Sequence, residues 1–440
     1  MNKERKSGVL IVSLFAIKSN RSSTAQNTRN IAQYFVEKGA EVQIVTGGEI
    51  KEDIEQDDYI IKCYPLFEKN KRMKWYHFHR PNEFLKKNAK DFFKKWKPDI
   101  IYSGAMQGLQ EFIIEGGRNG IPVYQMIHDY SLFCLKQWLV KPNGEICNGP
   151  EKSHCKNCIE NSLGKNDKIK NKILSFPIIG EILRLCLAKD SRYFVHVSSL
   201  IEESFYLRKQ MLMKIKKFIS QGNNVSNVLE HNTLNKEDIL FLPQYIGKSR
   251  LIKYDKGPKD YEKIIFCFIG RWTALKGKEI LGKSFNDMIS TKKVEMWIIT
   301  PNRNIKYLEE ISFSKSGKNK KIKIFNDVNG KEVSKLISKT HCTVVPSIWK
   351  EVGPRVILES FSQGIPVITT NYVGENNIVI DNFNGALFDS TKPESLTAIM
   401  ENIVGDPIIL KTWTRNINNK INKEEWYKRL DQIKMMNRAL

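Results

Sequence analysis

A short loop rich in glycine and positive charge follows one of the most apolar segments of the chain. Residues 263–269 read KIIFCFI, which is typical of a buried parallel strand, and the loop that follows runs from Gly270 to Gly277 as GRWTALKG. Open α/β sheets bind ligands at the carboxyl ends of their strands, where a helix that begins there adds free backbone N–H groups. Arg271 and Lys276 in this position suit a diphosphate, although a solvated basic loop would have the same composition.

Two glutamates eight positions apart follow a second apolar strand. Glu351 and Glu359 enclose the sequence VGPRVIL, after the strand-like residues 342–345. A helix over the whole interval would separate the two by about 12 Å, which is wider than the roughly 5–9.5 Å between the carboxylates of glycoside hydrolases. The spacing therefore argues against a hydrolase pair and suits hydroxyl groups at the two ends of an elongated ligand. Gly353 would let the backbone approach that ligand closely.

Strand-like and helix-like segments alternate along the chain and would position these motifs. In the first half we expect helices over 24–38 and 83–96, between strands at 9–15, 41–46, 99–103 and 121–127. The alternation resumes after residue 255, with strands expected at 263–269, 295–300, 321–325, 342–345 and 366–369, whereas residues 407–440 read as helices. This pattern predicts an α/β protein with two doubly wound domains facing each other across a cleft.

The motifs of the second half resemble the nucleotide-sugar-binding half of glycosyltransferase family 4, the group 1 glycosyltransferases of GT-B fold. The residues that carry the resemblance are Gly270-Arg271 with Lys276-Gly277, Ser347-Ile-Trp349, Glu351-x7-Glu359, Gly364-x-Pro366-Val367, Gly374-Glu375 and Asn384-Gly385. The resemblance implies two Rossmann-like domains. It also implies that Arg271 and Lys276 stabilise the donor diphosphate without a divalent metal, that Glu351 orients the donor sugar and that Glu359 holds the ribose. Gly270, Gly353, Arg355 and Val356 would complete the donor site.

The first half matches the family more loosely. His128 follows the strand expected at 121–127, and a lone histidine is more often structural, but the resemblance implies that this one contacts the donor sugar. Residues 194–199 and 239–243 resemble the closing strands of the domain. The stretch from Lys18 to Thr24 stands in place of the usual Gly-Gly loop, and Thr300-Pro301-Asn302 replaces a Gly-x-Gly. The contacts to acceptor and base are therefore left unassigned.

Four cysteines lie within 25 positions of the first half: Cys134, Cys147, Cys155 and Cys158. A set of four that includes one C-x-x-C pair is compatible with a structural zinc ion, and equally with reduced thiols in a mobile loop over the active site. Family members carry a similar insertion, which we place at residues 130–165. Eight cysteines in 440 residues are too few for a disulfide framework, so reduced cytoplasmic thiols are expected.

The net charge of +23 predicts an anionic partner. Between Lys69 and Lys97, eleven cations face only Glu83 and Asp91, with Trp75, Tyr76 and Phe78 among them. The segment could be a solvated helix whose apolar face packs on the sheet. It could also attract anionic lipid headgroups through Lys86, Lys87, Lys94 and Lys95, with residues 169–189 as a second contact.

The same patterns exclude an integral membrane protein, because no apolar run reaches the ~20 residues of a spanning helix. The basic, apolar start at residues 1–17 is interpreted as a buried first strand, since no small-residue cleavage site of a signal peptide follows it. We expect an acceptor-binding domain at 1–250, a nucleotide-sugar-binding domain at 251–410, and a carboxyl-terminal helical segment at 411–440 that packs back towards the first domain.

The predicted function is transfer of a hexose-type sugar from a nucleotide-diphosphate sugar to a lipid-linked or surface-polysaccharide acceptor. Retention of configuration is implied by the family alone. The enzyme is expected in the cytoplasm, on the inner face of the cell membrane. No cofactor is expected for catalysis. A sugar phosphorylase or an epimerase of the same fold is an alternative. A basic nucleic-acid-binding protein is a second alternative, but the chain has no nucleic-acid-reading motif and nucleic acid is not an expected partner.

Overall fold

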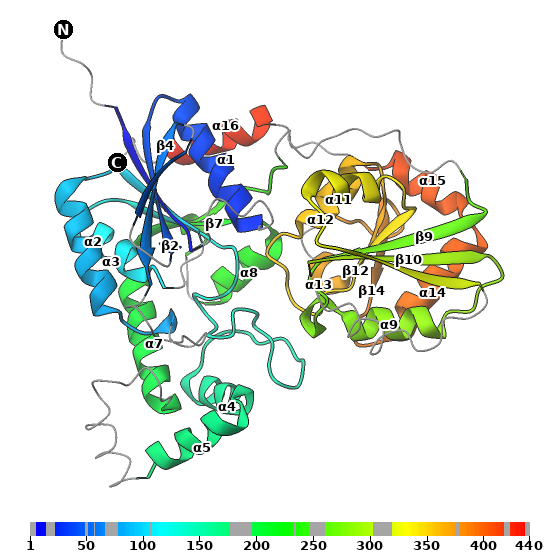
Figure 1. Cartoon of the computed structure of the whole chain (residues 1–440), viewed down its shortest axis with the longest axis horizontal. Helices are drawn as coiled ribbons and strands as arrows, with labels where there is room; N and C mark the ends of the chain where they lie inside the picture. Colours follow the sequence, from blue (N-terminus) through cyan, green and yellow to red (C-terminus); the bar gives the residue numbers. More distant parts are fainter. Residues whose placement is uncertain are drawn as a thin grey trace. The chain divides into compact units, whose positions relative to one another are not determined.

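The chain forms two compact units, each with a mainly parallel sheet and covering helices (Figure 1). The computed structural model describes residues 6–14, 23–48, 52–56, 58–66, 78–104, 108–176, 196–232, 235–246, 260–301, 319–374, 378–417 and 423–435. Unit 1 comprises residues up to 221 together with 226–241, and unit 2 comprises 222–225 together with the chain from 242 onward. The boundary predicted between residues 250 and 251 lies outside the described residues, as do residues 18–22, 69–76, 177–189, 302 and 375.

Unit 1 contains an eight-stranded sheet in the order β3-β4-β2-β1-β5-β6-β7-β8. All neighbouring pairs are parallel except β3 with β4. Every residue of β1 is buried, because helices cover both faces of the strand, and this confirms the interpretation of the apolar start as a strand. The strands are β1 (Gly8–Val12), β2 (Glu41–Gly48), β3 (Glu52–Gln56), β4 (Tyr59–Pro65), β5 (Ile100–Ser103), β6 (Val123–Met126), β7 (Ile215–Ser220) and β8 (Ile239–Phe241).

The expectation of a strand at residues 194–199 was wrong for residues 196–199, and residues 194 and 195 lie outside the described residues. His196 precedes a helix, α7, and the buried residues Val197, Leu200 and Ile201 are spaced for one helical face rather than for alternation across a strand. No helix in the described parts of the chain is long and apolar enough to cross a membrane. The helices of this half are α1 (Ser23–Glu37), α2 (Glu83–Lys95), α3 (Gln110–Arg118), α4 (Lys152–Ser162), α5 (Lys165–Leu174), α7 (Val197–Leu212) and α8 (Asn223–His231).

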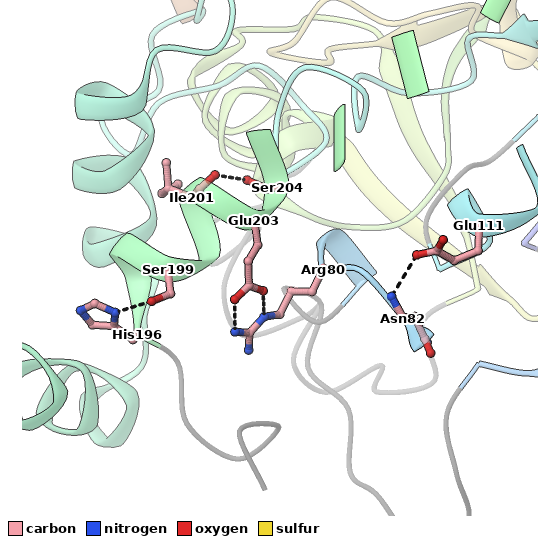
Figure 2. Close-up of polar contacts among 8 residues, drawn as sticks. All are labelled: Arg80, Asn82, Glu111, His196, Ser199, Ile201, Glu203 and Ser204. Carbon is pink, nitrogen blue, oxygen red and sulfur yellow. Dashed lines mark hydrogen bonds and ion pairs between the residues drawn. The ribbon is translucent and has the colours of Figure 1, made fainter. Parts of the chain in front are cut away.

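Helix α2 carries much of the basic segment and buries its apolar face. Leu85, Ala89, Phe92 and Phe93 are all buried, so the interpretation as a solvated helix packed through one side is confirmed for α2. The side chain of Asn82 caps the helix by accepting a hydrogen bond from the N–H of Leu85. The backbone N–H of Asn82 in turn donates to Glu111 of α3, 3.0 Å away (Figure 2).

Unit 2 contains a six-stranded parallel sheet in the order β11-β10-β9-β12-β13-β14. In order of appearance this is 3-2-1-4-5-6, the order of doubly wound dinucleotide-binding folds. The strands are β9 (Lys263–Ile269), β10 (Lys293–Thr300), β11 (Lys320–Asn326), β12 (Cys342–Val345), β13 (Val367–Thr370) and β14 (Gly385–Phe388). The two units therefore confirm the predicted α/β class and the alternation from which it was inferred.

Side chains alternate across β9 and fill two separate cores. Phe266 and Phe268 pack with α9 and α14 on one face, whereas Ile265 and Cys267 pack on the other face, beneath α11. The helices of this half are α9 (Lys278–Asp287), α11 (Gly330–Ile337), α12 (Arg355–Ser362), α13 (Asn371–Gly374), α14 (Pro393–Gly405), α15 (Ile408–Arg415) and α16 (Lys423–Met435). Helices on both faces explain why β9 is a continuous apolar run rather than an alternating one.

The last described helix, α16, contacts the segment that follows β8. The indole Nε1 of Trp426 donates to the carbonyl oxygen of Pro243 at 3.0 Å, and its ring stacks on Tyr245 with centroids 5.7 Å apart. Trp426 is buried in this contact. The expectation of helices and no strand after residue 407 is confirmed for the described residues.

We expect Arg80→Ala to lower the free energy of unfolding by about 1–3 kcal/mol. Arg80 forms a two-pronged ion pair with Glu203 of α7, in which Nη2 lies 2.8 Å from Oε1, and so ties the turn before α2 to α7 (Figure 2). The control is Lys86→Ala, which removes an exposed i,i+3 pair with Glu83 and should leave the free energy of unfolding nearly unchanged. Urea denaturation measures both, and equal costs would show that the Arg80 pair contributes no more than a surface pair.

Candidate functional site

The two loops singled out by sequence meet where the strand order of unit 2 reverses. Strands β9 and β12 are hydrogen-bonded neighbours in the middle of the sheet, although the chain visits β10 and β11 between them. The loop 270–277 leaves the carboxyl end of β9, and residues 346–354 leave the carboxyl end of β12. Ligands of open α/β sheets bind at this point, because the connections diverge there and leave a crevice.

Backbone contacts hold the two loops together. The N–H of Ile348 donates to the carbonyl oxygen of Leu275 at 3.1 Å, so the second loop is hydrogen-bonded to the short 3-10 turn η5 (Ala274–Lys276) of the first. Gly277 has a φ of 76°, and a Cβ atom built on it would lie 1.9 Å from the carbonyl oxygen of Pro346. Only glycine fits this position, both for its conformation and for its space.

An ion pair occupies the place where the loops meet. The Nζ atom of Lys276 lies 2.5 Å from Oε1 of Glu351, and the hydroxyl of Ser347 donates to the same oxygen. Glu351 is only 5% exposed, and the ammonium group also lies over the ring of Trp349, 5.7 Å from its centroid. Each partner compensates the charge of the other in a partly dehydrated position, which makes the pair sensitive to any ligand that competes for the lysine.

The remaining donor-site candidates of unit 2 lie on or beside α12. Arg355 and Glu359 are both buried on its first two turns, with Nε and Oε1 3.7 Å apart. Val356 packs against the core cluster of Val345 and Val367, so only its backbone is suited to contact a ligand. Residues 351–354 precede the helix, and only the residues from Arg355 onward are helical. The separation calculated for a helix from Glu351 to Glu359 therefore does not describe the whole interval.

Gly353 and Arg271, two further residues expected at the donor site, lie in different surroundings. A Cβ atom on Gly353 would lie 2.7 Å from Nε2 of Gln244, so the close approach that glycine permits here is to a side chain of the protein itself. Arg271 is exposed on the loop that begins at Gly270, whose φ is 148°. Sequence reasoning missed Gln244 altogether, because nothing in its local pattern indicates that it packs beside residue 353.

In unit 1, His128 lies at the carboxyl ends of three neighbouring strands. It follows β6, while Gly104 follows β5 and Gln221 follows β7. The Nε2 atom of Gln221 lies 3.2 Å from Nδ1 of His128, and burial lowers the pKa of the imidazole to about 4. The ring is therefore neutral at neutral pH. If the amide donates to Nδ1, the proton is on Nε2, which could then donate to a ligand hydroxyl.

The four clustered cysteines of unit 1 line a single cavity of about 390 Å³. Cys155 and Cys158 lie one turn apart on α4, and the N–H of Cys147 donates to the carbonyl oxygen of Leu139 at 2.7 Å. Burial raises the pKa of Cys155 to about 11, so its thiol is protonated at neutral pH. Within the described ranges, no three His, Cys, Asp or Glu side chains form a group that could hold a metal ion. Zinc at these cysteines stays a prediction.

Comparisons with known proteins agree with this arrangement. Residues 250–420 match the family described as glycosyl transferases group 1. An uncharacterized glycosyltransferase of Methanocaldococcus jannaschii is 25% identical over 234 residues, which is 51% of this chain and 59% of that protein's length. A UDP-Gal:alpha-D-GlcNAc-diphosphoundecaprenol alpha-1,3-galactosyltransferase of Escherichia coli is 31% identical over 104 residues, covering 23% of this chain and 26% of that one.

The fold is similar to that of solved structures over nearly the whole chain. A sucrose-phosphate synthase from Thermosynechococcus elongatus superposes with a TM-score of 0.68 at 13% identity, covering 99% of this chain and 100% of the other. At this identity the likeness shows the fold alone, and it confirms the GT-B class. The family match confirms the resemblance drawn from the motifs around Lys276 and Glu351, both of which lie inside the matched residues.

We expect Gly277→Ala to destabilise the protein far more than Gly120→Ala. Both glycines have nearly the same left-handed backbone, with φ of 76° and 72°, but a Cβ on Gly120 meets nothing within 4 Å. The control should therefore cost about 1 kcal/mol for conformation alone, whereas Gly277→Ala must also separate the loops, at a further cost of about 2 kcal/mol or more. Equal midpoints in urea denaturation would contradict the packing described for Gly277.

The zinc prediction can be tested by metal analysis of the purified protein. A site made by Cys134, Cys147, Cys155 and Cys158 would give near-stoichiometric zinc that is lost from a Cys155→Ser/Cys158→Ser variant, because thiolates supply all four ligands. Cys63→Ser, which removes a buried cysteine of the same unit, serves as the control and should leave the zinc content unchanged. Metal-free protein with an unchanged melting temperature would leave these residues as reduced thiols.

Proposed function

We propose that this chain, whose residues 250–420 match the group 1 glycosyltransferases, transfers a hexose-type sugar from a nucleotide-diphosphate sugar to a lipid-linked or surface-polysaccharide acceptor. The observation that carries the proposal is the ion pair of Lys276 with Glu351, at the point where the strand order of unit 2 reverses. A cation and a carboxylate held side by side there match the two ends of a sugar diphosphate, which presents negative phosphates and neutral hydroxyls.

The proposed chemistry places charge where these side chains can stabilise it. Negative charge grows on the leaving diphosphate, and positive character grows at the anomeric carbon. Arg271 and Lys276 stabilise the diphosphate, while Glu351 accepts hydrogen bonds from the donor sugar. Glu359 holds the ribose hydroxyls, with its position set by Arg355. No divalent metal enters this proposal, since two cationic side chains supply the compensating charge.

The roles assigned outside the ion pair rest on the family resemblance together with local structure. His128 is assigned to the donor sugar as a neutral donor, in keeping with its lowered pKa. Retention of configuration follows from the family. A lipid-linked acceptor is supported by the name of the Escherichia coli relative, whose acceptor is attached to diphosphoundecaprenol. We place the acceptor in unit 1 and the enzyme on the inner face of the cell membrane, to which its net charge of +23 would attract it.

The first experiment is a thermal-shift screen with UDP, GDP, ADP and their common sugar conjugates. A specific ligand raises the melting temperature by mass action, so the screen identifies the base and the sugar together. Donor turnover that requires inorganic phosphate would instead indicate a phosphorylase, and sugar isomerisation without acceptor would indicate an epimerase. Stabilisation by random DNA alone, without any response to nucleotides, would contradict the proposal.

Three variants should separate the roles of the charged side chains. Lys276→Ala removes the cation that faces the developing charge, so kcat should fall by about 10²–10³ and nucleotide affinity should also fall. Glu359→Gln should weaken donor and free nucleotide to a similar extent, raising KM at nearly constant kcat, because the ribose changes little during the reaction. Glu351→Gln should keep or raise the affinity for free nucleotide, because it removes the carboxylate that competes with the phosphates for Lys276, but it should lower turnover.

Isothermal titration with the nucleoside diphosphate found in the screen, beside steady-state kinetics, measures all three variants. Glu394→Gln, at an exposed position in the first turn of α14, is the control and should match the parent protein. Loss of nucleotide affinity in Glu351→Gln, with normal affinity in Glu359→Gln, would reverse the assignment of the two carboxylates. Unchanged kinetics in all three variants would show that the site lies elsewhere.

A further inference from the structure

Helix α5 exposes its large apolar side chains. Ile169 is 59% exposed, Ile173 is 43% exposed, and Phe176, just beyond the helix, is 52% exposed. Ile169 and Ile173 are four residues apart, and Phe176 follows three residues later, so the three extend along one side of the helix. Single exposed apolar residues are common on protein surfaces, but an aligned set marks an interaction site.

The side of α5 that packs against unit 1 is partly polar. Asn171 is buried, and its Oδ1 accepts a hydrogen bond from the N–H of Val197, at the start of α7, at 2.8 Å. Its Nδ2 atom lies 3.4 Å from a carboxylate oxygen of Glu160 on α4, and Leu174 is the buried apolar neighbour. The helix is thus attached to the protein through an asparagine while its isoleucines face outward. A helix that packed for stability alone would bury the isoleucines.

Positive charge flanks the exposed apolar side. Lys165, Lys168 and Lys172 are exposed on α5, and between residues 165 and 176 the sole acidic residue is Asp167. On a helix with about 100° per residue, these three lysines lie on one flank of the isoleucines and Lys170 lies on the other. Long cationic side chains beside an apolar stripe can reach headgroup phosphates while the stripe enters the acyl boundary.

Helix α2 carries more of the lysines noted in the sequence than α5 does, but it does not combine them with a row of exposed apolar side chains. Leu85, Phe92 and Phe93 are buried and Phe84, at 36%, is the single large apolar side chain of α2 that is exposed, so Lys86 and its neighbours can attract a negative surface but bring less apolar area to it than α5 does. Charge alone gives reversible, salt-sensitive contact, whereas charge with apolar burial gives a stable interfacial position. Figure 1 shows α5 with α4 at the edge of unit 1, away from the strands of its sheet.

We propose that α5 binds the surface of an anionic phospholipid bilayer, with Ile169, Ile173 and Phe176 entering the interface. Lys165, Lys168 and Lys172 then lie at the level of the phosphates. A lipid surface matches both the positive charge and the exposed apolar side chains of α5. A nucleic acid would contact the lysines but not the isoleucines. This inference rests on the proposed function in one respect, because a lipid-linked acceptor requires a membrane-bound enzyme.

The test is flotation of the full chain with vesicles of phosphatidylglycerol and phosphatidylcholine, without donor or acceptor. Ile169→Ser/Ile173→Ser/Phe176→Ser should lower the vesicle partition coefficient by about tenfold or more, because it removes most of the buried apolar area. The matched control is Ile289→Ser/Ile408→Ser, which changes two isoleucines of unit 2 that are 82% and 66% exposed and should leave partition unchanged. Circular dichroism and melting temperatures verify that both variants fold.

Charge variants and hydrogen exchange complete the test. Lys165→Gln/Lys168→Gln/Lys172→Gln should weaken binding and flatten its dependence on salt, and amides of residues 165–176 should gain protection when vesicles are added. Equal binding to neutral and anionic vesicles would overturn the proposal. So would loss of binding only when Lys86, Lys87, Lys94 and Lys95 are changed, or a dimer in solution that the apolar variant abolishes. None of these readouts needs sugar transfer, so a failure here is separate from a failure of the proposed function.

Discussion

The approach of two loop backbones in unit 2 is the constraint on which the candidate site depends. Gly277 and Pro346 are so close that no side chain fits between them, and the hydrogen bond from Ile348 to Leu275 fixes the register of one loop on the other. Lys276 precedes the glycine, and Ser347 follows the proline. Their side chains therefore meet Glu351 without large conformational freedom, and the site is organised before any ligand arrives.

Preorganisation of this kind has an electrostatic consequence for ligand binding. The ammonium group of Lys276 is already paired with the carboxylate of Glu351. A diphosphate that binds this lysine would therefore have to compete with the carboxylate. The competition lowers affinity for phosphate alone. A ligand with hydroxyl groups to satisfy the carboxylate would restore the balance, since both charges then keep a partner. A buried pair can thus favour a sugar diphosphate over simpler anions.

The sequence predicted the alternation of strands and helices well, because continuous apolar runs such as residues 263–269 have few structural alternatives. It failed at residues 196–199, where apolar and small residues fit either a strand or the start of α7, and only the spacing of Leu200 and Ile201 with later residues distinguishes the helix. In the candidate site, residue types and order singled out the loops of Lys276 and Glu351, which the structure brings together. The partnership of Gly353 with Gln244 was not predictable, because it depends on packing between segments more than a hundred residues apart. The sequence indicated residues 169–189 as a second lipid contact, but it did not show that the isoleucines of α5 are exposed, because the pattern shows one apolar side and not which side the protein covers.

The contact of Trp426 with the segment after β8 constrains the order in which the chain can fold during synthesis. The indole and its acceptor, the carbonyl of Pro243, are 183 positions apart in the sequence. At translation rates of 5–20 residues per second, residues 243–245 wait roughly 10–40 s in the nascent chain before this partner has been made. The sheet of unit 1 ends at Phe241 and is complete before that point, whereas the segment beyond it reaches its final packing only after Trp426 has been made. Folding of this region therefore depends on the synthesis of α16 and not only on the emergence of residues 243–245 themselves.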